Sequence, residues 1–194
     1  NGSSATAFNV LTQLIRLHQI TCGHMATDSH DIIDIKSNRL DELVQILGEN
    51  SGKVIIWANY IYDINQIKKA VEKEFGEDSY CTYYGATLAK DRQKCINDFQ
   101  DPNSPVRFFI GNTQTGGYGI TLTAASTVIY YSNNYDLEKR IQSEDRAHRI
   151  GQMNKVLYID LVAKGTVDVK IIRSLRNKVN IAKEISGEEL ISWI

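Results

Sequence analysis

Residues 106–131 read VRFFIGNTQTGGYGITLTAASTVIYY, in which two short apolar runs flank a loop that holds four glycines between Gly111 and Thr121. Runs that are almost continuously apolar are typical of strands buried on both faces of a parallel sheet. Such sheets bind ligands at the carboxyl ends of their strands, which is where this loop begins. Glycine permits backbone conformations and close approaches that other residues do not, so we expect the loop to contact a ligand or to move.

The same alternation of apolar runs and helical patterns extends over most of the chain. Strands are predicted at residues 53–57, 80–84, 106–110, 127–131 and 156–162. Helices are predicted from their periodicity and end signals near residues 7–21, 37–48, 64–75, 87–99 and 167–182. Strands that alternate with helices predict an α/β fold with a mainly parallel sheet and helices on both faces. The segment from Gly23 to Lys36 is predicted to be a loop.

We expect one central domain with two extensions, because 194 residues suffice for one substantial core. The predicted parts are an N-terminal helical extension and loop (1–36), a central lobe (37–163) and a C-terminal basic helix and tail (164–194). With 22 basic and 23 acidic residues, the chain is not expected to coat nucleic acid by bulk charge. Between Lys164 and Lys183, however, six basic residues accompany a single acidic one, so a local basic surface is expected there.

The sequence predicts no membrane span, because it has no apolar run of about 18 residues. It predicts no secretory signal, because its first residues, NGSSATAFNV, have neither a basic start nor a long apolar stretch. Its three cysteines are odd in number and form no C-x-x-C pair, so we expect a reducing compartment, the cytoplasm, and no disulfide framework. His18 and Cys22 share a predicted helix face, with His24 and His30 nearby, and these residue types bind zinc. Their spacing matches no paired zinc-ligand motif, so no metal site is predicted.

The segment QSEDRAHRIGQ begins at Gln142 and places Arg146 and Arg149 four and seven residues further on. On a continuous helix, this spacing puts the three side chains on one face. In one interpretation, Glu144 and Asp145 neutralise the arginines in a solvated surface network. In the other, the arginines bind phosphate, since a planar and permanently charged guanidinium suits the spread charge of a phosphoryl group.

Seven blocks of the sequence, taken in order, resemble one family. They are LHQITCGH, SNRLDELVQIL, GKVIIWANY, YYGATLAKDRQKCINDFQ, IGNTQTGGYGITLTAASTVIYY, QSEDRAHRIGQ and GTVDVKIIRSLRNK. Together they resemble the second RecA-like lobe of Swi/Snf-type ATPases, the double-stranded-DNA translocases of helicase superfamily two. The resemblance extends from about Leu11 to Lys183 and implies a RecA-like three-layer fold with helical extensions at both ends.

The resemblance also implies a division of labour between two lobes. In that family the first lobe carries the phosphate-binding loop and the acidic Mg²⁺ box, so ATP and Mg²⁺ would be bound mainly by an N-terminal lobe of the same polypeptide. The second lobe supplies arginine fingers, for which Arg146 and Arg149 are the candidates, with Gln142 as the glutamine of the motif. The present chain alone is therefore expected not to hydrolyse ATP.

In this family the glycine-rich loop couples the nucleotide cleft to DNA. Its residues Gly117 and Gly119, together with Asp145, are the candidates for that coupling. The partner implied is double-stranded DNA, bound without sequence preference through its sugar-phosphate backbone. The candidates for this contact are Thr113, Gln114, Thr115, Asn59 and Tyr60.

Some segments depart from the family pattern, among them YYSNNYD at residues 130–136 and His18, where an arginine is common. These departures favour a bacterial or bacteriophage branch of the family. The alternative function is a nucleic-acid-binding or regulatory module that keeps the fold without the motor, although the intact QSEDRAHRIGQ segment argues against it. A Rossmann-like transferase is disfavoured, because no G-x-G-x-x-G opens the predicted sheet.

Overall fold

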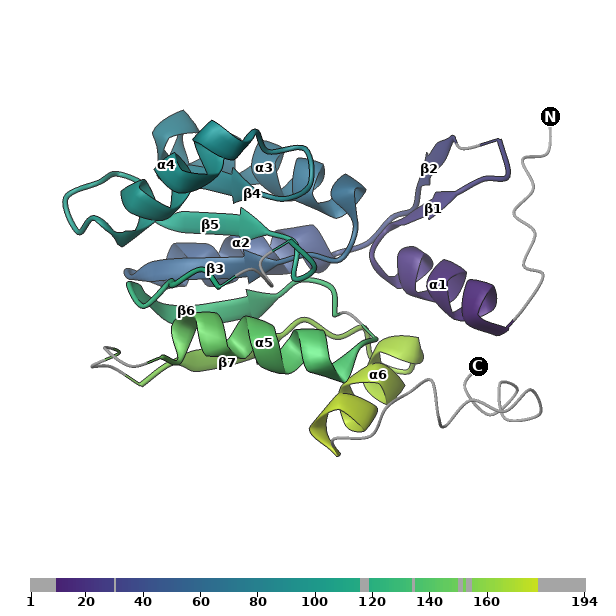
Figure 1. The fold of residues 1–194 in the computed structure, drawn as a ribbon. Coiled ribbons are helices and arrows are strands. Elements are labelled where there is room, and N and C mark those ends of the chain that lie inside the picture. Colours follow the sequence, from purple (N-terminus) through teal and green to yellow (C-terminus); the bar gives the residue numbers. More distant parts are fainter. Residues whose placement is uncertain are drawn as a thin grey trace. The chain divides into compact units, whose positions relative to one another are not determined.

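The computed structural model describes residues 10–29, 31–115, 119–133, 135–149, 152 and 155–177 (Figure 1). The chain divides into two compact units. The smaller unit consists of residues 1–39 and 162–194, and the larger unit consists of residues 40–161. None of the helices within the described ranges combines the length and the apolar character that crossing a membrane requires.

The larger unit is built on one five-stranded sheet in which all neighbouring strands are parallel. In spatial order the strands are β4 (Tyr80–Tyr83), β5 (Phe108–Gly111), β3 (Lys53–Trp57), β6 (Ala125–Tyr130) and β7 (Leu157–Asp160). The central strand β3 pairs with β5 and β6, and Trp57 lies opposite both Gly111 and Tyr130. The carboxyl ends of these three strands therefore lie side by side, along what we call the carboxyl edge of the sheet. The predicted parallel sheet is confirmed.

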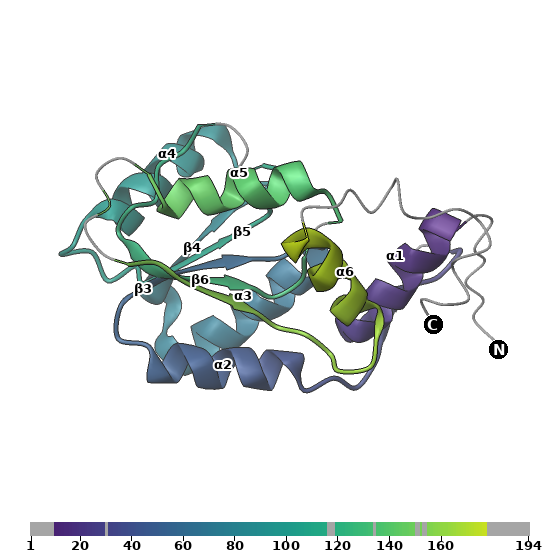
Figure 2. The same ribbon diagram turned by 90° about the horizontal axis from the view of Figure 1, so that it is seen from below.

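Helices cover both faces of this sheet, which gives three layers (Figure 2). The helices are α2 (Arg39–Glu49) and α3 (Ile61–Phe75) on one face and α4 (Ala89–Gln100) and α5 (Leu137–Ala147) on the other, with a 3₁₀ turn, η1 (Glu77–Ser79), before β4. Along β3, Val54 and Ile56 pack with α2 and α3, whereas Ile55 and Trp57 pack on the opposite face. Because both faces are buried, the strand is a continuous apolar run. The predicted α/β fold is confirmed.

Among its described residues, the smaller unit has two helices and a hairpin. They are α1 (Val10–Thr21), β1 (His24–Ala26), β2 (Ile32–Asp34) and α6 (Val167–Arg176), with β1 and β2 antiparallel. The prediction of a loop from Gly23 to Lys36 is wrong, because strands of three residues are too short to show a period of two. Gly23, at φ +92°, turns the chain from α1 into the hairpin. The predicted end of the last helix, near residue 182, lies outside the described residues.

A buried ionic cluster joins the helices of the smaller unit. Arg39 pairs with Asp168 of α6. The same carboxylate accepts hydrogen bonds from the Thr21 hydroxyl at 2.8 Å and from the Ala163 N–H at 2.9 Å. His18 of α1 is 1% exposed, and its Nε2 atom lies 3.7 Å from Asp168 Oδ1. Desolvation lowers the pKa of His18 to about 4 despite the attraction of Asp168, and the charge of Arg39 adds to this lowering.

Two of the histidines near Cys22, His18 and His24, are buried in the smaller unit. His18 is engaged with the ionic cluster, and His24 is buried in β1. In the part of the chain that the structure describes, no three His, Cys, Asp or Glu side chains are grouped as metal ligands. His30 lies outside that part of the chain.

The low pKa of His18 predicts a loss of stability in mild acid. The unfolded chain protonates this imidazole near pH 6.5, whereas the folded chain does so only near pH 4. Between these values the unfolded state binds the extra proton, so this group should lower the free energy of unfolding by about 3 kcal/mol as the pH falls from 7 to 4. Urea unfolding of His18→Gln, which cannot titrate, should show a correspondingly smaller pH dependence. Identical pH dependence in both proteins would contradict this assignment.

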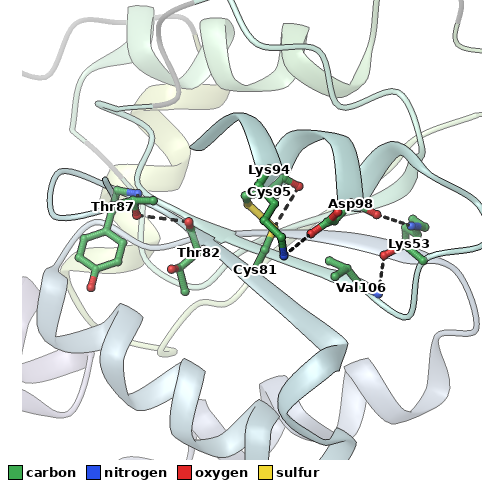
Figure 3. The surroundings of a disulfide bond; sticks show 10 residues. Lys53, Cys81, Thr82, Thr87, Lys94, Cys95, Asp98 and Val106 are labelled. Atoms are coloured by element: carbon green, nitrogen blue, oxygen red, sulfur yellow. Dashed lines mark hydrogen bonds and ion pairs between the residues drawn. A yellow bond between two sulfur atoms is a disulfide. The ribbon is translucent and has the colours of Figure 1, made fainter. Parts of the chain in front are cut away.

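In the larger unit, a disulfide ties the edge strand β4 to α4 (Figure 3). Cys81 lies on β4 and Cys95 on α4, with their Cα atoms 5.4 Å apart, a usual separation for a disulfide. Cys22, in the smaller unit, is a buried free thiol. The expectation that the cysteines form no disulfide is wrong for this pair. Residues 14 positions apart on a strand and a helix meet only through tertiary packing, which the absence of C-x-x-C does not exclude.

The disulfide should stabilise the larger unit by restricting its unfolded chain. Closing a loop of about 15 residues contributes about 3 kcal/mol, and for a chain of this size 1 kcal/mol shifts Tm by about 2–4 °C. Adding reductant should therefore lower the Tm measured by scanning calorimetry by about 6–12 °C. A variant with alanine at both Cys81 and Cys95 should melt at the same temperature with and without reductant. A similar shift in that variant would exclude the disulfide as the cause.

Candidate functional site

Two loops at the carboxyl edge are joined by one amide side chain. Asn112, directly after β5, donates from Nδ2 to the carbonyl oxygens of Ala58 at 3.1 Å and of Asn59 at 2.8 Å, in the loop after β3. Its Oδ1 accepts from the Gln114 N–H at 2.8 Å in its own loop. Because the amide nitrogen and the amide oxygen of Asn112 are both hydrogen-bonded, the side chain fixes the two loops relative to each other.

A second buried link joins the loop after β3 to the loop after β6. The Ser132 hydroxyl accepts from the Asn59 N–H at 2.8 Å and donates to the Asp63 carboxylate at 2.9 Å. Ser132 and Asp63 are each 1% exposed. Asn112, Ser132 and Asp63 were not among the residues predicted from the sequence. A sequence signal exists for Asn112 and Ser132, each of which is a polar residue at the end of a buried apolar run, as in FFIGN and VIYYS.

The five candidates for nucleic-acid contact lie on these two loops. They are Asn59 and Tyr60 after β3, and Thr113, Gln114 and Thr115 after β5. The structure brings the two groups together, because Asn112 bonds to both loops. Gln114 is exposed, whereas Thr113 is 4% exposed and its hydroxyl has no hydrogen-bond partner among the described residues. Gln114 is therefore open to a ligand, and a contact from Thr113 would require the loop to move.

The arginine segment lies at the carboxyl end of α5. That helix ends at Ala147, so Arg149 lies two residues beyond it. The prediction that Gln142, Arg146 and Arg149 share one helical face is wrong for Arg149, because the spacing rule assumes a helix that continues. Gln142 and Arg146 remain on α5 together with Asp145, which is exposed.

The glycine-rich loop and the arginine segment meet at residues 119–125, which we call the 119–125 segment. Arg149 Nη1 donates to the Gly119 carbonyl at 3.2 Å and to the Thr121 hydroxyl at 2.9 Å. The Arg146 carbonyl accepts from the Leu122 N–H at 2.9 Å. Arg149 is nevertheless exposed, so its guanidinium is both held in place and open to a ligand. The candidate Gly117 lies outside the described residues.

A third arginine, Arg140, anchors the start of α5 to the sheet. Its guanidinium pairs with Glu144 at 2.6 Å and with Asp160 of β7, and lies 3.5 Å from the ring centroid of Tyr130. Burial opposes its charge, but Tyr130, Asp160 and Glu144 together raise its pKa. Glu144 is thus engaged with Arg140, whereas Arg149 forms no ion pair with any described residue. The interpretation in which Glu144 and Asp145 neutralise the arginines is therefore wrong for Arg149 within the described residues.

Two tyrosines of the sheet hold the middle of α5. The Tyr130 hydroxyl lies 2.7 Å from the Ser143 hydroxyl, and the Tyr158 hydroxyl donates to the Glu144 carbonyl at 3.2 Å. Burial raises the pKa of both phenols, that of Tyr158 to about 12. Both therefore stay protonated at neutral pH and can maintain these hydrogen bonds.

The comparison with known families decides the identity of this fold. Residues 36–151, more than half of the chain, match the helicase conserved C-terminal domain. The chain belongs to this family. The chromatin-remodeling ATPase INO80 of Mycosarcoma maydis is 34% identical to this helicase C-terminal domain over 158 residues. The ISWI chromatin-remodeling complex ATPase ISW1 of Saccharomyces cerevisiae is 29% identical over 196 residues.

Both relatives are chromatin-remodeling ATPases, and this chain spans only a small part of their length. The alignments cover 81% and 93% of this chain but only 8% and 17% of the two relatives. The crystal structure of the C-terminal part of the Fun30 ATPase domain is similar, with a TM-score of 0.64 and 27% identity, over 71% of this chain and 45% of that chain. Both sequence relatives are fungal. The expectation of a bacterial or bacteriophage branch therefore has no support from them.

Removing the Arg140 anchor should destabilise the larger unit. Arg140→Met leaves the carboxylate of Asp160, which is 10% exposed, without its cation, and losing one partner of a buried pair costs about 3 kcal/mol or more. The matched control is Lys139→Met on the same helix, whose 3.8 Å pair with Asp136 is exposed and should contribute less than about 1 kcal/mol. Urea unfolding of the two variants measures the difference, and equal losses would contradict the anchoring role.

Proposed function

We propose that this domain is the second motor lobe of an ATP-dependent double-stranded-DNA translocase. ATP and Mg²⁺ are bound mainly by an N-terminal RecA-like lobe of the same polypeptide, and Arg146 and Arg149 contact the γ-phosphate across the cleft between the lobes. The observation that carries this proposal is the exposure of Arg149 and the kind of atoms that it bonds. Its exposed guanidinium is held by neutral oxygens of Gly119 and Thr121, so its full charge remains for an incoming phosphate.

The chemistry required of these arginines is electrostatic. As the terminal phosphoryl group is transferred to water, negative charge shifts among its oxygens, and a guanidinium already in place stabilises that charge without reorganisation. The anchors of α5 support such a fixed position. Gln142 and Asp145 line the same cleft in this proposal, and Gly117 and Gly119 let the loop change conformation between nucleotide states.

The DNA-binding surface proposed lies on the loops after β3 and β5. Asn59, Tyr60, Gln114 and Thr115, with Thr113 after a loop movement, contact the sugar-phosphate backbone. Neutral amide, hydroxyl and backbone donors suit contacts that position a duplex without reading its bases. Binding to this lobe should be weak, independent of sequence and sensitive to salt. The loop from Asn112 continues into the 119–125 segment, which supports coupling between DNA binding and hydrolysis.

DNA-stimulated ATP hydrolysis by the full-length protein tests the role of Arg149. Arg149→Ala should lower kcat by about a hundredfold or more, because the transition-state charge loses its cation, while ATP binding is retained. Lys90→Ala, which removes an exposed cation on α4, is the control and should hydrolyse ATP at the normal rate.

Two outcomes would contradict the proposal. Unchanged hydrolysis by Arg149→Ala would remove the arginine finger and favour the alternative of a nucleic-acid-binding or regulatory module. Appreciable Mg²⁺-dependent hydrolysis by the present chain alone would refute the division of the active site between two lobes.

A further inference from the structure

Two glutamine side chains hold the 119–125 segment. One precedes the segment in the sequence and the other follows it. Gln152, beyond α5, donates from Nε2 to the carbonyl oxygens of Thr123 at 2.9 Å and Ala125 at 3.0 Å. Gln100, the last residue of α4, accepts at Oε1 from the Ala124 N–H at 2.8 Å and donates from Nε2 to the Thr123 hydroxyl at 3.3 Å. Gln152 belongs to the arginine segment, whereas Gln100 lies outside both that segment and the glycine-rich loop.

Gln100 bonds to Thr123 and Ala124, which come directly before β6. They also come directly after the residues that bond to Arg146 and Arg149. Thr121, which accepts from Arg149, lies two residues before Thr123, and Leu122 bonds to the Arg146 carbonyl. Leu122 is fully buried, so the segment between Thr121 and Ala124 has little freedom once Gln100 is bonded. A displacement at Ala124 would therefore reach the acceptor of Arg149 through three peptide units.

The end of α4 that carries Gln100 is itself firmly seated. Phe99 is fully buried, with its ring centroid 5.5 Å from that of Phe109 on β5. Lys53 Nζ lies 5.5 Å from the Phe99 ring centroid and donates to the Asp101 carbonyl at 2.7 Å. One turn earlier, Cys95 is joined to β4 by the disulfide. The end of the helix that carries Gln100 is thus held by the core.

We propose that Gln100 is a positioning residue for the arginine fingers, a role that rests on the function proposed above. It touches neither nucleotide nor DNA. By bonding both the Ala124 N–H and the Thr123 hydroxyl, it fixes the 119–125 segment on α4, and that segment in turn presents Gly119 and Thr121 to Arg149. Arginine fingers stabilise a transition state only when they are held close to the productive geometry, so loosening their support should lower kcat.

The test compares three variants of the full-length protein in DNA-stimulated ATP hydrolysis. Gln100→Met keeps the length of the side chain but removes both hydrogen bonds, and should lower kcat on the order of threefold to thirtyfold, with KM for ATP unchanged. Gln100→Glu should restore kcat to within about twofold, because a carboxylate accepts from both the Ala124 N–H and the Thr123 hydroxyl. Gln93→Met is the control, since Gln93 is exposed on α4 and its side chain bonds, within the described part of the chain, only to Asn97.

A purely structural role would give a different pattern. In that case Gln100→Met would lower the thermal midpoint without a selective loss of kcat at temperatures where it is folded, and this result would overturn the proposal. If Gln100→Met does not fold, Thr123→Val removes one of the two bonds from the loop side, and a normal kcat in that variant would overturn the proposal equally.

A double variant separates this inference from the proposed function. If Gln100 acts through the arginine, Gln100→Met combined with Arg149→Ala should be no slower than Arg149→Ala alone. A full additional loss in the double variant would overturn the positioning role. A normal rate in Gln100→Met together with a slow Arg149→Ala would refute only this inference. A normal rate in Arg149→Ala would refute the arginine finger, and the role of Gln100 with it.

Discussion

The parallel pairing of β3 with both β5 and β6 is the constraint on which the rest of the larger unit depends. Trp57 lies opposite Gly111 and Tyr130, so the three strands end at the same level and their loops begin side by side. The pairing also requires that the backbone of Gly111 lie close to the Trp57 ring, because a Cβ atom at this position would lie 2.8 Å from the ring. Contacts such as those of Asn112 are possible only because this register places the loops within hydrogen-bonding distance.

Burial then decides which polar side chains hold the loops. A polar group removed from water is costly unless it is bonded, and Asn112, Ser132 and Asp63 are each at least nine-tenths buried. Ser132 and Asp63 satisfy each other while Ser132 also accepts from the backbone, and Asn112 is satisfied entirely by backbone groups. The loops at the carboxyl edge are therefore fixed from beneath, while Gln114 remains exposed above them.

The parts of the structure that the sequence predicted are those with strong local signals. The run KVIIW became β3 with the predicted bounds, because burial on both faces leaves an unmistakable apolar pattern. The hairpin at residues 24–34 was missed because its strands have three residues each. The disulfide and the bonds of Asn112 join residues distant in sequence, so no local pattern could have revealed them. The helical spacing of Arg149 was misleading because periodicity does not mark where a helix stops.

The three arginines of the α5 region show how one residue type is divided between structure and the proposed chemistry. Arg140 is bonded to two carboxylates and stacked on Tyr130, so its charge is already compensated. Arg149 is bonded to a carbonyl and a hydroxyl oxygen, which orient a guanidinium without neutralising it. An anion that approaches Arg149 therefore gains the interaction with a whole positive charge, whereas at Arg140 it would have to compete with Asp160 and Glu144. The charge of a partner decides whether an arginine is an anchor or remains available to a phosphate, and sequence spacing alone does not reveal that partner.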